Sequence, residues 1–302
     1  MIILVFFNDG LLDDIKSHES PPKIIKNFLS HDEVKQLIDF EVNSPKFVNR
    51  DDGTKTGLGI DGASVKDYND WDPKIKEILL EKIQNEIGDF IINQTEFPPH
   101  FFNTKYPIKL HADTGRDSNA KIFKQILLPL KITPEKNPAY TIIFKRKWYD
   151  QATGFTSTKN LSQTGNHYDI LDLSGKFVGF NNIEIFYDEI KNHVGETIEK
   201  NEGKFSITPD FLSKIKNLLT QERYNIQSDK HIDNNIPFDK DTYEKYLSHL
   251  DYDSLIGQEV ETIFKWEPGS ALIWDRTHLH SSSNYMKDNV TDKLGIAIFT
   301  IR

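Results

Sequence analysis

Two segments in the first third of the chain repeat apolar residues at helical spacing. Residues 30–33 (Ser-His-Asp-Glu) have the pattern of a capping box, and apolar side chains follow at positions 34, 37, 38 and 40. A second helix is predicted to begin at Asp72, as N-cap, and Pro73, in the first turn, with an apolar stripe from position 75 to 91. Each helix has one apolar face, so we expect both to pack against a sheet.

Strand-like patterns dominate the middle and the end of the chain. Runs rich in Ile, Phe, Tyr and Leu, separated by polar turns with Pro or Gly, predict strands at 101–110, 122–132, 139–148, 260–266, 271–274 and 295–301. The apolar run at 1–7 also predicts a strand, because it is too short for a signal peptide or a membrane span. Strands and helices do not alternate, which favours a mainly β fold with flanking helices, an antiparallel sandwich or barrel.

Between about residues 150 and 255 the pattern loosens into polar loops and two short predicted helices, near 208–219 and 242–250. We interpret this block as an insertion or lid. The whole chain, 1–302, is then a single domain whose core comprises roughly 24–147 plus 256–302. Loops on a rigid scaffold often determine specificity, so the insertion is expected to shape the entrance to any site.

Composition and charge narrow the classes of function. With 37% hydrophobic residues and 20 Phe, the chain has enough apolar surface to fold, and its net charge of −9 argues against nucleic acid as a partner. It contains no cysteine, which excludes disulfides, thiolate metal sites and iron–sulfur clusters. Any metal must bind to His, Asp or Glu, which favours iron, manganese, copper or a catalytic zinc. We expect a cytoplasmic protein with no membrane partner and a small-molecule or peptidyl substrate.

The pattern His-x-Asp/Glu is the main candidate for a metal site. With ten His and 46 acidic residues some matches arise by chance, and five occur: 31/33, 111/113, 167/169, 231/233 and 249/251. Residues i and i+2 point the same way only on a strand, which argues against the first and last pairs, in predicted helices. The pair 231/233 lies in a polar loop, while His167/Asp169 remains a rival on a short possible strand. His111 and Asp113 have the best setting, because they end an aromatic strand.

A third ligand would come from the segment 271–284, which holds His278 and His280. Both histidines point to the same side if this segment is extended, so the spacing alone does not choose between them. Together with His111 and Asp113, either one completes a two-histidine, one-carboxylate set. That donor set is typical of non-haem iron oxygenases.

With these residues, the chain resembles the Fe(II)- and 2-oxoglutarate-dependent dioxygenases of the prolyl-hydroxylase-like and phytanoyl-hydroxylase-like type. The resemblance rests on segments 24–38, 111–113 (His-Ala-Asp), 268–275 (Pro-Gly-Ser-Ala-Leu-Ile-Trp-Asp), 280–284 and 293–300. It implies a double-stranded β-helix core, a jelly roll of the cupin-like kind. It also implies Fe(II), with 2-oxoglutarate and O2 as co-substrates, and hydroxylation coupled to oxidative decarboxylation. The block between residues 147 and 258 lies outside the resemblance.

The resemblance also assigns individual residues. It places His280 rather than His278 as the distal ligand, because His280 begins the small polar run, with His111 and Asp113 as the other two ligands. Lys293 matches the basic residue that binds the far carboxylate of 2-oxoglutarate, although the family more often has Arg there. The other basic residues considered for this role are Lys287 and Arg302. The residues near the ligands that are candidates to contact co-substrate or substrate are Tyr106, Asn284 and Arg276.

Two alternatives stay open. The first is a cupin-like metalloenzyme that does not use 2-oxoglutarate. The second is a non-catalytic β-sandwich that binds a sugar or a protein, with structural histidines. The sequence does not indicate the substrate or the oligomeric state.

Overall fold

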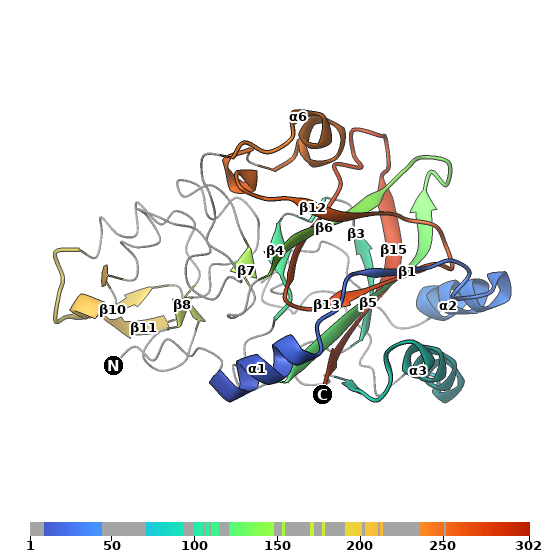
Figure 1. Cartoon of the computed structure of the whole chain (residues 1–302), viewed down its shortest axis with the longest axis horizontal. Helices are drawn as coiled ribbons and strands as arrows, with labels where there is room; N and C mark the ends of the chain where they lie inside the picture. Colours follow the sequence, from blue (N-terminus) through green and yellow to red (C-terminus); the bar gives the residue numbers. More distant parts are fainter. Residues whose placement is uncertain are drawn as a thin grey trace.

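Two antiparallel β-sheets form the centre of the protein (Figure 1). The computed structural model describes residues 9–43, 71–92, 99–104, 107–108, 110–114, 121–147, 153–154, 170–171, 177–178, 191–200, 203–210, 212–213, 236–250 and 252–302. The first sheet has the strand order β1-β13-β5-β15-β2, with β3 also paired to β15. Its strands are β1 (Lys23–Ile25), β2 (Ile91–Ile92), β3 (His100–Thr104), β5 (Ile122–Thr133), β13 (Ala271–Asp275) and β15 (Asp292–Ile301).

The second sheet has the order β12-β6-β14-β4-β7. Its strands are β4 (His111–Ala112), β6 (Tyr140–Lys147), β7 (Thr153–Gly154), β12 (Val260–Lys265) and β14 (His278–Ser282). Two small hairpins, β8 (Ile170–Leu171) with β9 (Phe177–Val178) and β10 (Thr197–Lys200) with β11 (Gly203–Ser206), lie in the predicted insertion. Every strand pairing described is antiparallel, and most of the described elements are strands, which confirms the predicted mainly β class.

The two predicted helices form with the predicted N-terminal signals. Helix α2 (His31–Asn43) begins with a reciprocal capping box: the Ser30 backbone N–H donates to the Glu33 carboxylate (2.6 Å), and the Glu33 N–H donates to Ser30 Oγ (3.2 Å). Helix α3 (Pro73–Ile87) begins after Asp72, whose carboxylate accepts the N–H of Lys74 at 2.8 Å. Both helices lie together beside the first sheet (Figure 1).

Helix α1 (Asp9–Ser17) is an element that the hydrophobic pattern did not reveal. The predicted strand at 1–7, just before it, lies outside the described residues. None of the helices in the described ranges combines the length and the apolar character needed to cross a bilayer.

Alternation along β5 shows how the layers are arranged. Ile126, Leu128 and Leu130 pack in one cluster with side chains of α2 and α3, whereas Leu127 packs in another with Ile143 of the second sheet. Successive side chains of a strand point to opposite faces. The first sheet therefore has an outer face covered by helices and an inner face that packs against the second sheet.

The outer face of the second sheet is covered by the last part of the predicted insertion. This cover comprises α6 (Lys240–Thr242), the π-helical turn η2 (Tyr243–Leu247) and the 3₁₀ turn η3 (Tyr252–Leu255). Phe238 and Leu247 pack there with Phe144 of β6 and Leu279 of β14. Phe238 and Leu247, which lie in the predicted insertion, thus belong to the hydrophobic core. The insertion boundaries at 150 and 255 otherwise remain a prediction.

One predicted strand is divided between the two sheets. The pattern predicted a single strand over 101–110 that leads directly into His111. Instead β3 ends at Thr104 and pairs with β15 in the first sheet, whereas His111 begins the separate short strand β4 in the second sheet. A continuous run of apolar and aromatic residues carries no signal for a crossing from one sheet to the next.

Candidate metal centre

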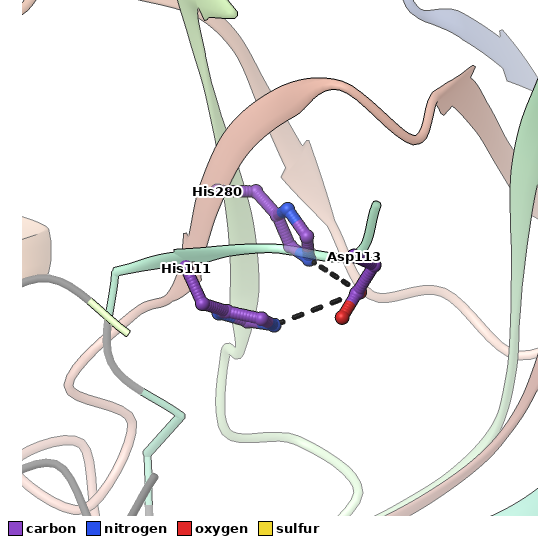
Figure 2. A group of neighbouring side chains, drawn as sticks. All are labelled: His111, Asp113 and His280. Carbon is purple, nitrogen blue, oxygen red and sulfur yellow. Dashed lines mark ion pairs between the residues drawn. The ribbon is translucent and has the colours of Figure 1, made fainter. Parts of the chain in front are cut away.

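The three residues singled out from the sequence come together in the structure. His111 is the first residue of β4, and Asp113 follows that strand directly. His280 lies in the middle of β14, where it is the register partner of His111. Pairing of these two antiparallel strands therefore places both imidazoles side by side, although 169 positions separate them in the sequence, counting from 111 to 280. Figure 2 shows both rings directed towards Asp113.

The ligand atoms are close enough for one ion. Asp113 Oδ2 lies 3.1 Å from His280 Nε2 and 3.7 Å from His111 Nε2, and the two imidazole centroids are 4.1 Å apart (Figure 2). One ligand atom from each residue lies within 4.8 Å of the other two. Adjacent ligands of one metal ion with bonds of about 2.1 Å are about 3.0–3.4 Å apart. The observed separations are near that range.

The surroundings of Asp113 favour the ionised form of its carboxyl. Burial raises the pKa of the Asp113 carboxyl, but the neighbouring His111 and His280 and a contact with the Gln125 side chain outweigh burial and lower it. Asp113 is only 8% exposed and His280 4% exposed. The carboxylate is therefore ionised and shielded from water.

Contacts of His280 fix which nitrogen faces Asp113. Its Nδ1 lies 3.0 Å from the backbone carbonyl of His278. A carbonyl only accepts, so this hydrogen bond requires a proton on Nδ1. In the neutral imidazole the lone pair is then on Nε2, the nitrogen that faces Asp113. Such a second hydrogen bond is the usual way in which a protein orients a metal-binding histidine.

His278 shares a face of β14 with His280 but has other partners. Leu279, between them, packs in the outer cluster, so both histidines lie on the opposite face. A bulge in the pairing with β6 falls between the two histidines. His278 Nε2 lies 3.0 Å from Glu261 Oε2, and its Nδ1 lies 3.3 Å from the Asp275 carbonyl. In the described part of the chain, the cluster of possible metal ligands contains His280 and not His278.

Two inner-face residues of the first sheet border the centre. Trp274 of β13 contacts His280 with ring centroids 5.2 Å apart, and its register partner on β5 is Gln125. Neither residue was predicted from the sequence as part of the site. Trp274 lies two residues after Leu272 on a predicted strand, and residues i and i+2 share a face, so both belong to the inter-sheet cluster.

Arg276 acts on the backbone of a candidate ligand. Its guanidinium is fully buried, and Nε donates to the Asp113 carbonyl at 2.8 Å while Nη1 donates to the Thr300 carbonyl at 3.2 Å. These bonds hold the segment after β4 against the end of β15. The sequence had suggested that Arg276 contacts co-substrate or substrate. Its observed contacts make it a residue that positions Asp113.

The candidate basic residues differ in location. Lys293, near the start of β15, is buried, with its ammonium over the rings of Trp266 and Tyr285 in the inter-sheet cluster. Lys287 is exposed and donates to the backbone carbonyl of Glu244. Arg302, which follows β15, is exposed, and its guanidinium lies over the ring of Phe123.

The remaining candidate residues either contact the outer cover or lie outside the described ranges. Asn284 donates through Nδ2 to Ser248 Oγ at 3.0 Å, so it ties the turn after β14 to the outer cover. Tyr106 and the rival pair His167/Asp169 lie outside the described residues. So does the pair 231/233.

The sequence matches no family model and no curated protein. Its structure is similar to that of SnoN, a non-heme alpha-ketoglutarate-dependent epimerase from nogalamycin biosynthesis, with TM-score 0.43 and 8% identity over 97% of this chain and 83% of that chain. SnoK, an alpha-ketoglutarate-dependent carbocyclase from the same biosynthesis, gives TM-score 0.41 and 8% identity over 96% and 83%. SnoN in complex with Fe3+, alpha ketoglutarate and nogalamycin RO gives 0.42 and 7% over 97% and 83%. TM-scores below 0.5 at such identities establish no shared reaction.

Proposed function

We propose that this protein is a non-haem iron oxygenase that consumes 2-oxoglutarate and O2 to oxidise a C–H bond of a substrate, most simply by hydroxylation. The observation that carries this proposal is the convergence of His111, Asp113 and His280 on one point. The sequence resemblance supplies the reaction class. We further propose that the two sheets form a double-stranded β-helix.

The donor set fits Fe(II). Two imidazole nitrogens and one ionised carboxylate lie together at a largely buried position, in a chain with no cysteine that could supply a thiolate. A facial set of this kind leaves open positions for other ligands, as non-haem iron oxygenases require. When bound, the iron would supply O2 activation coupled to oxidative decarboxylation of 2-oxoglutarate, giving succinate and CO2.

The residues of the chain have separable tasks in this proposal. His111, Asp113 and His280 hold the metal, and Asp113 supplies the negative charge that partly offsets the charge of the metal. Arg276 fixes the Asp113 backbone through its 2.8 Å bond to the carbonyl. Trp274 packs against the His280 ring and excludes water on that side.

Lys293 is our candidate for the far carboxylate of 2-oxoglutarate. Its neighbour Leu294 packs in the helix-side cluster, so Lys293 faces the inter-sheet interior, as Trp274 does. Tyr106 and Asn284 stay as sequence-based candidates for co-substrate contacts. The substrate class remains that predicted from the sequence: a small metabolite, an amino acid or a peptidyl side chain.

Turnover of 2-oxoglutarate in the absence of substrate tests this function. The protein is incubated with Fe(II), ascorbate, 2-oxoglutarate and air, and succinate is measured. We expect slow succinate formation that is lost in Asp113→Asn and kept in Asp32→Asn, an exposed residue in the first turn of α2. Metal binding without succinate would favour a metalloenzyme that does not use 2-oxoglutarate. Absence of metal binding by folded protein would favour a non-catalytic sandwich.

A further inference from the structure

The Lys293 side chain ends in an aromatic cage. Its Nζ lies 3.9 Å from the ring centroid of Trp266 and 4.9 Å from that of Tyr285. Both rings are themselves fixed: the Trp266 indole N–H donates to Thr141 Oγ1 at 2.9 Å, and the Tyr285 hydroxyl donates to the Thr104 carbonyl at 3.2 Å. The cage therefore holds the amine at a defined position in the interior.

No anion within the described ranges balances this amine. Lys293 is 2% exposed, and its Nζ makes no ion pair or hydrogen bond to any described residue. The elements packed around it carry several charged or titratable side chains: Asp292 on β15, Lys124 and Lys131 on β5, His100 on β3, Glu261 and Lys265 on β12 with Glu267 after Trp266, and Tyr285 with Lys287 and Asp288 on its turn. Asp292 instead bonds through its carboxylate to Thr291 and Thr133.

Burial without a counter-ion disfavours the charged form of an amine. It lowers the pKa of Lys293 from its usual value of 10.5 to about 7, and burial is the only cause that acts on it. The two aromatic faces attract an ammonium, which limits the loss but does not replace an anion. Near neutral pH, Lys293 thus exists as both the neutral amine and the ammonium.

We propose that Trp266 and Tyr285 position Lys293 as a carboxylate site that takes up one proton from solvent when a dicarboxylate binds. This inference rests on the proposed function, because the dicarboxylate is 2-oxoglutarate. In this step the neutral amine, one proton from solvent and the incoming dianion give an ammonium–carboxylate pair. No bond to carbon forms or breaks. Both aromatic residues are positioning residues that act through Lys293.

The site should therefore select a ligand with a second carboxylate, because that carboxylate supplies the anion that pairs with Lys293 in the interior. A 2-oxoacid that lacks a second carboxylate, such as pyruvate, offers no charge to Lys293 and draws no proton. Co-substrate affinity should also fall as the pH rises above 7, because more of the protein must then be protonated upon binding.

Calorimetry measures this proton directly. The Mn(II)-loaded protein is titrated anaerobically with 2-oxoglutarate in phosphate and in Tris, buffers that differ strongly in ionisation enthalpy. A group with a pKa near 7 predicts uptake of about 0.9 proton at pH 8 and about 0.1 at pH 6. Pyruvate is the control and should bind with equal heat in both buffers.

Variants distinguish an effect of the aromatic cage on proton uptake from a general loss of stability. Lys293→Arg stays charged at all these pH values, so it should bind 2-oxoglutarate without proton uptake. Tyr285→Phe keeps the ring and should keep the uptake of wild type, whereas Trp266→Leu removes the nearer ring and should weaken binding at pH 8 at least about tenfold. Trp266→Phe, a milder change, should lie between them if the leucine variant does not fold.

The outcomes are distinct. Binding of 2-oxoglutarate with no proton uptake at pH 8, or equal uptake in wild type and Lys293→Arg, would overturn this inference and leave the proposed function intact. Absence of 2-oxoglutarate binding would contradict the proposed function itself.

Discussion

Two histidines on one face of β14 should give opposite results when each is removed. His278 is 1% exposed and contacts Glu261 Oε2 at 3.0 Å, whereas His280 contacts Asp113 Oδ2 at 3.1 Å. Removing the His278 ring leaves a partly buried carboxylate without its partner, a loss of about 1–3 kcal/mol in the free energy of unfolding. Removing the His280 ring takes away one of three candidate ligands and should primarily reduce metal affinity.

The expected effect on metal binding is large for only one variant. Loss of a residue that only hydrogen-bonds to a metal ligand usually weakens metal binding by about 10- to 100-fold. His280→Ala removes a ligand itself, so it should weaken metal binding by more than that. His278→Ala keeps all three ligands, so its affinity should stay within about tenfold of wild type, since it keeps the backbone carbonyl that accepts from His280 Nδ1.

The assay combines two measurements on each variant. Anaerobic titration with Co(II), followed by its visible absorption, gives metal affinity, and urea unfolding in the presence of a chelator gives the stability of the metal-free protein. The reasoning is refuted if His278→Ala loses Co(II) while His280→Ala retains it. It is also refuted if both variants bind as tightly as wild type.

Three further predictions concern stability. Ser30→Ala should lower the free energy of unfolding by about 1 kcal/mol, because it removes the hydroxyl that caps α2. The same capping box involves Glu33: burial raises the pKa of its carboxyl, but hydrogen bonds from Ser30 and Lys82 outweigh burial and lower the pKa. A lowered carboxyl pKa stabilises the fold above the unfolded value of 4.5, and this effect is lost as the pH falls. Ser30→Ala keeps the backbone N–H that donates to Glu33, so most of this pH dependence should persist in the variant, as urea unfolding at pH 7 and pH 3 would show. Gly269→Ala should destabilise by more than 1 kcal/mol in thermal unfolding, since φ is 83° and an added Cβ would lie 2.7 Å from the Leu29 carbonyl oxygen. Co(II) at about 100 times its dissociation constant should stabilise the protein by about 2.7 kcal/mol, and a chelator should reverse this in differential scanning calorimetry.

Local signals predicted the local elements. The capping box at Ser30 and the Asp72-Pro73 start identified α2 and α3, because caps and amphipathic spacing are properties of neighbouring residues. Apolar and aromatic runs bounded by polar turns identified β5, β6, β12, β13 and β15 within a few residues. Helix α1 was not predicted; it has only nine residues, and no capping motif was identified at its start from the sequence.

Long-range pairing was beyond these signals. The register partnership of His111 with His280, and the placement of β3 and β4 in different sheets, depend on contacts between distant segments. The cage around Lys293 also required three-dimensional information, because Trp266 and Tyr285 lie on turns that flank strands and not on its own strand. The choice of His280 over His278 came from the resemblance. The structure adds the Glu261 contact, which occupies His278.

The central claim is that His111, Asp113 and His280 bind iron together with 2-oxoglutarate. Its most direct test is to add Fe(II) and 2-oxoglutarate to the protein without oxygen and record the visible absorption. We predict a weak metal-to-ligand charge-transfer band in wild type and in His278→Ala, and none in His280→Ala. Absence of the band in folded wild-type protein, or its persistence in His280→Ala, would contradict the claim.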